Sequence, residues 1–192
     1  MARVAKHGIE KMALKFKINK EKALESIVLI ASEWENVKSL SLSKCLFFAE
    51  KDHMNKYGRP IIGDTYLAML YGPHSSTVRD YITEDYLLSD HAEEIAAAIK
   101  VTRTKKYIKI QAKRAPRMEV FSNSDLECIR AAIKKCEHTD FDTLIKWTCK
   151  EKAWLNAPLN EPMNYEDFID QDNLYWEAAL EEAREFARVG VL

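Results

Sequence analysis

Turn-forming residues and long apolar runs are both scarce in this chain. Its 192 residues include five glycines and five prolines, and together with abundant alanine, glutamate, lysine and leucine this favours helices. No apolar run approaches the roughly 20 residues that cross a bilayer, and the N-terminus lacks the apolar stretch of a signal peptide. We therefore expect a cytoplasmic protein without a membrane partner.

Several chemical signatures are missing as well. The cysteines show neither a C-x-x-C pair nor a regular spacing, so neither a zinc finger nor a disulfide framework is indicated. We expect reduced thiols that mostly face the core. The chain also lacks the G-x-S-x-G, G-x-x-x-x-G-K and G-x-G-x-x-G motifs. These absences favour a protein that is not an enzyme and holds no cofactor. The cysteines are Cys45, Cys128, Cys136 and Cys149.

What the chain does contain is the composition of a globular protein, with 47% hydrophobic and 31% charged residues. Its length fits one domain, or one domain with an appendage. The net charge of −1 conceals two blocks of opposite sign. Residues 100–118 carry eight Lys or Arg and no acid, whereas residues 161–185 carry nine acids and the single Arg184. Either block could attract a charged partner, or each could attract the other.

Helices are predicted along most of the chain. Apolar residues at steps of three and four indicate a helix within residues 20–37, and Ser41 or Ser43 is expected to cap a second helix that ends at Gly58. A helix starting near residue 124 has Ser124 and Glu127 at the spacing of a capping box. Further helices are predicted within 75–88, 90–99, 140–149 and 174–190, the one at 140–149 starting at Asp140 or Thr139.

Strands are predicted in two places. Residues 64–71 are expected to form a short strand that breaks at Gly72 and Pro73, and residues 106–112 are expected to pair with 118–122 through a turn at 113–117. We therefore predict an α+β fold that is mainly α-helical, with one small antiparallel sheet of about three short strands. The predicted division is a basic lead-in (1–20), a main domain (21–157), and a linker with an acidic helix that packs on or near it (158–192).

Residues 56–76, "KYGRPIIGDTYLAMLYGPHSS", concentrate three of the five glycines and two of the five prolines. One hypothesis is a small hydrolase or metal site formed by His53, Asp64, Tyr66 and His74. The alternative is that His53 makes a core hydrogen bond, Asp64 caps a turn and His74 is exposed. The absence of H-x-x-x-H and H-E-x-x-H favours the alternative. Backbone geometry accounts for the glycines: Gly58 ends a helix, and Gly63 and Gly72 shape the ends of a strand.

Tyrosine, histidine and arginine on a short turn-strand-turn are typical of protein-binding surfaces, because they offer contact area at low entropic cost. The alternative is that Tyr66 and Tyr71 merely cover the core. The candidate partner-binding residues are His53, Tyr57, Arg59, Asp64, Tyr66, Tyr71, His74 and Ser75.

The basic block offers a second candidate surface, for nucleic acid or an acidic partner, with Tyr107 able to stack on a base. The alternative is a solvated strand edge that its lysines protect from pairing. The candidate contacts are Lys105, Lys106, Lys109, Lys113, Arg114 and Arg117.

Residues 41–76 resemble the signature of the Panacea domain, an antitoxin-associated family that includes SocA-like and phage-associated GepA-like proteins. In that family, "K-L-L-Y-F-A-(D)-x-x-H" leads through "Y-G-R-P-I-x-G-D-x-Y-x-A" to "Y-G-P-V-P-S". The similarity extends more faintly to Asn156, with Trp154 in the place of a final tryptophan. The matching positions are Lys44, Leu46, Phe48, Ala49, His53, Tyr57, Gly58, Arg59, Pro60, Gly63, Asp64, Tyr66, Ala68, Tyr71, Gly72 and Pro73.

The chain departs from the family pattern in two places. His74 and Ser75 replace the usual "V-P", and Cys149 stands where a later histidine is common. If that histidine belonged to a catalytic site of the family, this chain would lack it, which further disfavours an enzyme.

The resemblance implies a non-enzymatic antitoxin of a prokaryote or phage that neutralises a protein toxin, encoded by the adjacent gene, through direct binding. A homo-oligomer is compatible with this role. The alternative is a nucleic-acid-binding regulator that uses the basic block, and the third hypothesis is the hydrolase or metal protein around His53, Asp64 and His74.

Overall fold

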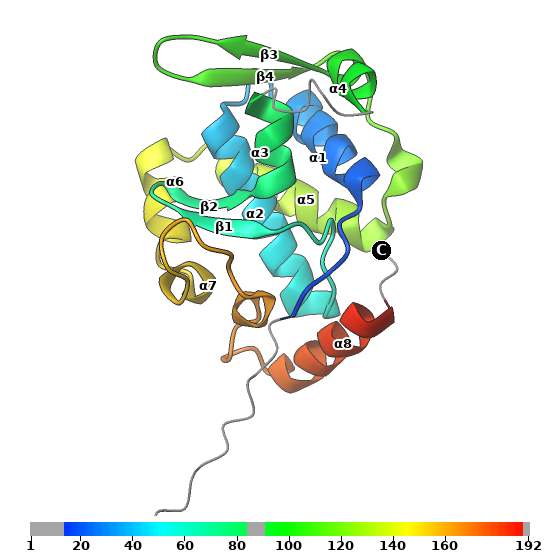
Figure 1. Cartoon of the computed structure of the whole chain (residues 1–192), viewed down its shortest axis with the longest axis vertical. Helices are drawn as coiled ribbons and strands as arrows, with labels where there is room; N and C mark the ends of the chain where they lie inside the picture. The colour runs from blue at the N-terminus through cyan, green and yellow to red at the C-terminus, as the bar shows by residue number, and fades with distance from the viewer. Residues whose placement is uncertain (1–13, 84–90, 190–192) are drawn as a thin grey trace, which may run out of the picture.

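Helices dominate the structure, with two short hairpins beside them (Figure 1). The computed structural model describes residues 14–83 and 91–189. The predicted mainly helical α+β class is confirmed. The α-helices are α1 (Lys20–Glu33), α2 (Ser39–Tyr57), α3 (Ser76–Thr83), α4 (Ala92–Ala98), α5 (Asn123–Cys136), α6 (Phe141–Thr148), α7 (Lys152–Leu155) and α8 (Trp176–Val189). The 3₁₀ helices are η2 (Met118–Val120) and η3 (Tyr165–Phe168), and the strands are β1 (Tyr66–Met69), β2 (Gly72–Ser75), β3 (Ile99–Arg103) and β4 (Ile108–Ala112).

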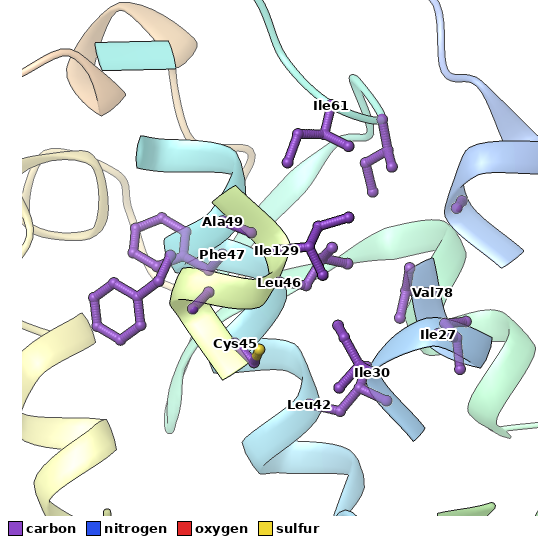
Figure 2. Close-up of a cluster of buried hydrophobic side chains, with 14 of the residues drawn as sticks. Ile27, Ile30, Leu42, Cys45, Leu46, Phe47, Ala49, Ile61, Val78 and Ile129 are labelled. Atoms are coloured by element: carbon purple, nitrogen blue, oxygen red, sulfur yellow. The ribbon is translucent and has the colours of Figure 1, made fainter. Parts of the chain in front are cut away.

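Helix α2 is the centre of the fold. It contacts α1, α5, α6, α8 and the first hairpin, so thirteen of its nineteen residues are buried. Figure 2 shows Leu42, Cys45 and Leu46 of α2 together with Ile30 of α1 and Ile129 of α5 in one apolar cluster. Because so much of α2 is covered, charged residues along it are buried as well, and each has to find a partner inside the protein.

The ends of α2 match the sequence prediction only on one side. The helix ends at Gly58, which has the predicted left-handed conformation with φ +58°. It begins at Ser39, however, so Ser41 and Ser43 lie inside the helix and do not cap it. The hydroxyl of Ser43 donates to the carbonyl of Ser39 at 3.0 Å, one turn earlier. This bond to the preceding turn lets Ser43 lie inside the helix, where its side chain does not act as a cap.

The predicted start of α5 is also corrected. The capping box consists of Ser122 and Asp125, two residues earlier than the predicted pair of Ser124 and Glu127. Ser124 instead receives a hydrogen bond from Arg59, and Glu127 lies on the exposed face of α5. Both serine-acid pairs have the spacing of a capping box, and the tertiary contacts select one of them. The start of α6 at Asp140 is confirmed.

The strands form two separate two-stranded antiparallel sheets, not the single predicted sheet. In the first, β1 pairs with β2, and the chain reverses at Leu70 and Tyr71. Gly72 and Pro73 therefore begin the second strand of a hairpin, whereas the sequence predicted the end of a strand there. Pro73 is tolerated because its ring occupies a position that donates no hydrogen bond to β1.

The second sheet has a different partner strand from the predicted one. Strand β4 pairs with the preceding strand β3, with Val101 opposite Ile110, and residues 118–120 form η2 instead of a strand. The side chains that follow β4 account for the absence of the predicted second strand. Arg114 and Arg117 both bind the buried carboxylate of Glu25 on α1, so the chain runs towards α1 after β4. Ile110 is buried, as its strand alternation predicts.

Residues 158–169, predicted as a polar linker, pack into the same body as α2. The N–H of Ala68 donates to the carbonyl of Glu161 at 3.0 Å, and the N–H of Met163 donates to the carbonyl of Tyr66 at 2.8 Å. The segment thus runs along the free edge of β1 and buries Tyr165 and Phe168. The predicted division into lead-in, domain and tail stays a prediction.

The two charged blocks lie apart. The β3–β4 hairpin is at one end of the molecule and the acidic helix α8 at the other (Figure 1), and no ion pair joins described residues of the two blocks. Helix α8 packs on the end of α2, where a Cβ at Gly58 would lie 2.7 Å from the carbonyl oxygen of Ala179.

All four cysteines fall in the described part of the chain and carry free thiols, three of them buried, as predicted. Within residues 14–83 and 91–189, no helix is both long and apolar enough to cross a membrane.

Candidate protein-binding surface around the first hairpin

Glu50 anchors the turn that leads from α2 to the first hairpin. Its carboxylate is completely buried and accepts hydrogen bonds from the N–H groups of Ile61, Ile62 and Gly63 at 3.0 to 3.2 Å. Burial raises the pKa of the Glu50 carboxyl, and these N–H donors partly offset the rise. Successive N–H groups that converge on one carboxylate fix the path of this turn, and Gly63 adopts a positive φ (+68°), which glycine tolerates without strain.

His53 belongs to a second buried network that joins α2 to α5. Its Nδ1 donates to the carbonyl of Arg59 at 2.7 Å, and its Nε2 lies 3.2 Å from Oδ1 of Asp125. Asp125 also binds Lys22 at 2.9 Å and the guanidinium of Arg59 at 3.2 Å. Burial alone would raise the pKa of the Asp125 carboxyl, but the hydrogen bonds from His53 and Lys22 hold it well below its usual range. The network ties three helices and the post-α2 turn together.

Asp64 fixes the base of the first hairpin. Its buried carboxylate accepts from the hydroxyl of Ser75 and from the N–H of Thr77 at 2.7 Å. Thr77 lies in the first turn of α3, so Asp64 satisfies a helix N–H that would otherwise lack an acceptor. Asp64 therefore caps the start of α3, whereas the alternative interpretation had it cap a turn. His53 makes the core hydrogen bond that this interpretation gave it, and His74, expected to be exposed, is half-buried.

Lys44 on α2 contacts the first hairpin through its ammonium group. It is fully buried on α2, and its ammonium donates to the carbonyl of Pro73 at 3.0 Å. Burial lowers the pKa of Lys44 to about 7. Gly72 lies directly above: a Cβ there would be 2.6 Å from Oγ1 of Thr148 and 3.1 Å from Nζ of Lys44. The first hairpin can approach α2 and α6 this closely only because position 72 lacks a side chain.

A groove of about 300 Å³ opens beside this hairpin. Its walls come from the start of α2, the end of α3, strand β4 and the hairpin turn, and they are almost entirely apolar. At its edge, Leu70 is 65% exposed and Tyr71 is 52% exposed. The lining residues are Ser39, Leu40, Ser43, Met69, Leu70, Tyr71, His74, Arg79, Ile82, Thr83 and Ile108.

His74 is the main polar group of the groove. Burial, together with the nearby charges of Lys44 and Arg79, lowers the pKa of His74 to about 3, so its ring is neutral at physiological pH. Its Nδ1 lies 3.2 Å from the hydroxyl oxygen of Ser43. With the hydroxyl proton of Ser43 donated to Ser39, the tautomer that carries its proton on Nδ1 lets both hydrogen bonds of Ser43 form. In that tautomer Nε2 is an acceptor.

The eight predicted partner-binding residues differ in burial and fall into three groups. His53, Asp64, Tyr66 and Ser75 are buried, whereas Tyr71 is exposed. Tyr57, Arg59 and His74 are intermediate. Tyr66 packs among aromatic rings of the core, and its hydroxyl has no hydrogen-bond partner in the described part of the chain. Partner contact by these residues stays a prediction.

The proposed acid-base or metal constellation is not assembled. His53 faces α5, Asp64 faces the start of α3, and His74 contacts Ser43, so the three side chains have separate partners. The described residues contain no cluster of His, Cys, Asp and Glu suited to a metal ion.

The basic block divides between structural and exposed residues. Arg114 and Arg117 clamp the buried carboxylate of Glu25, with Arg117 Nε 3.0 Å from it. Lys113 donates to the carbonyl of Ala96. Lys105 and Lys106 lie exposed in the β3–β4 turn.

The last of the six candidate contacts, Lys109, lies on β4. Its ammonium is 5.5 Å from the ring of Tyr107, and Lys38 approaches the same ring at 5.2 Å.

Sequence reasoning missed Glu50, Lys44 and Asp125 as the residues that hold this surface in place. A signal was present for two of them, because Lys44 and Glu50 interrupt the otherwise apolar run of α2. Charged residues on a buried helix face need internal partners, but nothing in the sequence shows which groups those are.

Glu50, Lys44 and Asp125, which hold this surface in place, all lie within the region that a family model matches. No curated protein and no solved structure matches the chain. A family model described as "Antitoxin SocA-like, Panacea domain" matches residues 42–155, which is more than half of the chain and includes most of α2, both hairpins, α5 and α6. The chain therefore belongs to the SocA-like Panacea-domain antitoxin family.

Proposed function

We propose that this protein neutralises a cognate protein toxin in the cytoplasm by binding it directly, without catalysis. The observation that carries the proposal is the exposed apolar edge of the first hairpin, at Leu70 and Tyr71, in a domain of an antitoxin family. Large apolar side chains beside a preformed apolar groove are typical of protein-binding sites. Glu50, Lys44 and Asp64 hold the hairpin rigidly, so binding costs little conformational entropy.

Expression of the neighbouring gene provides the test. The product of that gene should arrest growth when expressed alone, and co-expression of this protein should restore growth. The two proteins should also co-purify at stoichiometric levels after affinity capture of either one. If growth arrest is relieved without a detectable complex, or if the neighbouring product is not toxic, the proposal is wrong.

A second candidate function, nucleic-acid binding, is supported by Lys105 and Lys106, which lie exposed beside Tyr107 at the tip of β3–β4. The probe is a DNA fragment that carries the promoter of the protein's own gene. Phosphate contacts would make the affinity for this fragment fall steeply as the salt concentration rises. A Lys105→Glu, Lys106→Glu variant should then lose the complex in a mobility-shift assay at low salt. Absence of any shift for the wild-type protein would remove this candidate.

A further inference from the structure

The groove beside the first hairpin has the features of a site for one kind of protein segment. Four elements that are distant in the sequence contribute to its walls, so it exists only in the folded protein. Its volume of about 300 Å³ is enough for two or three apolar side chains. Leu70 and Tyr71 project beside it, where they would cover an inserted segment from the solvent side.

The electrostatics of the groove limit its occupant. Arg79 is the only ionised side chain among the lining residues at physiological pH, and its guanidinium forms no ion pair with a described residue. A guanidinium at the rim of an apolar groove binds a carboxylate in a bidentate geometry and disfavours a basic segment.

His74 adds a requirement of a different kind. Its protonated Nδ1 is held by Ser43, and its Nε2 has no partner among the described residues. An acceptor in an apolar wall favours an occupant that brings a donor, such as a backbone N–H or a hydroxyl group, since an unpaired polar group lowers the affinity of the complex.

We infer that this groove, defined by Leu70, Tyr71, His74 and Arg79, is the docking site for an apolar segment of the partner protein that carries a carboxylate beside its apolar anchors. The inference rests on the proposed function and specifies its surface. The carboxylate pairs with Arg79, the anchors fill the groove under Leu70 and Tyr71, and a donor of the segment bonds Nε2 of His74.

Matched variants test the inference, with the product of the neighbouring gene as the probe and calorimetric titration as the readout. Leu70→Ser with Tyr71→Ser should weaken binding at least about 30-fold, the effect of losing a binding hot spot. Leu174→Ser with Tyr175→Ser is the control, because the same dipeptide is exposed at the start of α8, at the opposite end of the molecule.

Two further variants test the polar contacts. Arg79→Glu should weaken binding more than Arg79→Gln, whereas Arg188→Glu, an exposed charge reversal on α8, should leave it unchanged. His74→Phe keeps a ring of similar size but removes the acceptor, and should weaken binding by about five-fold. Urea unfolding of each variant, with a midpoint equal to that of the wild type, shows that the fold is intact.

The outcomes separate the inference from the proposed function. Loss of affinity in the groove variants but not in the α8 controls supports the inference. Wild-type affinity in the groove variants, or loss of affinity only in the α8 controls, overturns the inference and leaves toxin binding established. If the wild-type protein does not bind the neighbouring product, the proposed function fails and the inference fails with it. If Arg79→Glu impairs only promoter binding, the surface is for nucleic acid and the inference is wrong.

Discussion

The phenolic oxygen of Tyr165 lies 3.0 Å from a carboxylate oxygen of Glu50, although the two residues are 115 positions apart in the chain. The same phenolic oxygen lies 2.7 Å from the carbonyl oxygen of Asp64. Helix α2, the turn after it and the C-terminal segment therefore meet at one buried point. The first hairpin packs between these segments. Contacts from distant parts of the chain therefore fix the position of its exposed edge.

Removal of the Glu50 carboxylate should destabilise the whole domain. Glu50→Ala leaves three N–H groups of the turn buried without an acceptor, and each costs about 1 to 3 kcal/mol, so we expect a loss of at least about 3 kcal/mol. Glu50→Gln retains one acceptor oxygen and should lose less. Urea unfolding followed by circular dichroism measures both, with the exposed Glu181→Gln as the control. A Glu50→Ala variant as stable as the wild type would contradict the anchoring role.

Substitution of Gly72 should disturb the first hairpin. At φ +92° an alanine is strained, and its Cβ would lie 2.6 Å from Oγ1 of Thr148, so we expect a loss of roughly 2 kcal/mol from strain and overpacking. A Gly72→Ala, Thr148→Ala double variant should recover part of this loss, because the hydroxyl that clashes is gone. Equal stability of the single and double variants would show that the backbone strain alone is responsible.

Stability should depend on the protonation of Lys44. Its pKa is about 7 in the folded protein against an ordinary value of 10.5, so between these values the unfolded chain binds more protons and stability rises with pH. Below pH 7 the destabilisation is fully present, and it amounts to a few kcal/mol at about 1.4 kcal/mol per pKa unit.

Lys44→Met tests this directly. The difference in unfolding free energy between the variant and the wild type should favour the variant most at pH 6 and least at pH 10. The comparison cancels the raised pKa values of the buried thiols, since both proteins carry them. A difference that does not change between pH 6 and pH 10 would show that the pKa of Lys44 is not lowered in the folded protein.

The basic block should respond to substitution in two different ways. Arg114→Gln removes one of the two guanidinium groups that bind the buried carboxylate of Glu25, which leaves Arg117 as its only cation among the described residues, and should cost about 2 kcal/mol of stability. Lys106→Gln, at an exposed position of the same block, should leave the unfolding midpoint unchanged. Equal midpoints for the two variants would mean that the clamp on Glu25 contributes little to the fold.

Local sequence signals predicted the helices well and the strand partners poorly. The left-handed end of α2 at Gly58 and the start of α6 at Asp140 follow from properties of single residues, so they could be predicted. After β4, Arg114 binds Glu25, which lies almost ninety residues earlier on α1, and residues 118–120 form η2 and do not return to pair with β4. A choice between two neighbouring strand partners of similar propensity is decided by such long-range contacts.

The sequence by itself determined the mainly helical α+β class and the family, because helix periodicity and the motif around "YGRPIIGDTY" are local properties of the chain. Only the tertiary structure decided which motif residues are buried and which are exposed. His53, Asp64 and Tyr66 face inwards because α5, α3 and the C-terminal segment cover them, whereas Tyr71 lies at a hairpin turn that nothing described covers. Burial is set by what packs against a residue, and sequence spacing around one motif does not contain that information.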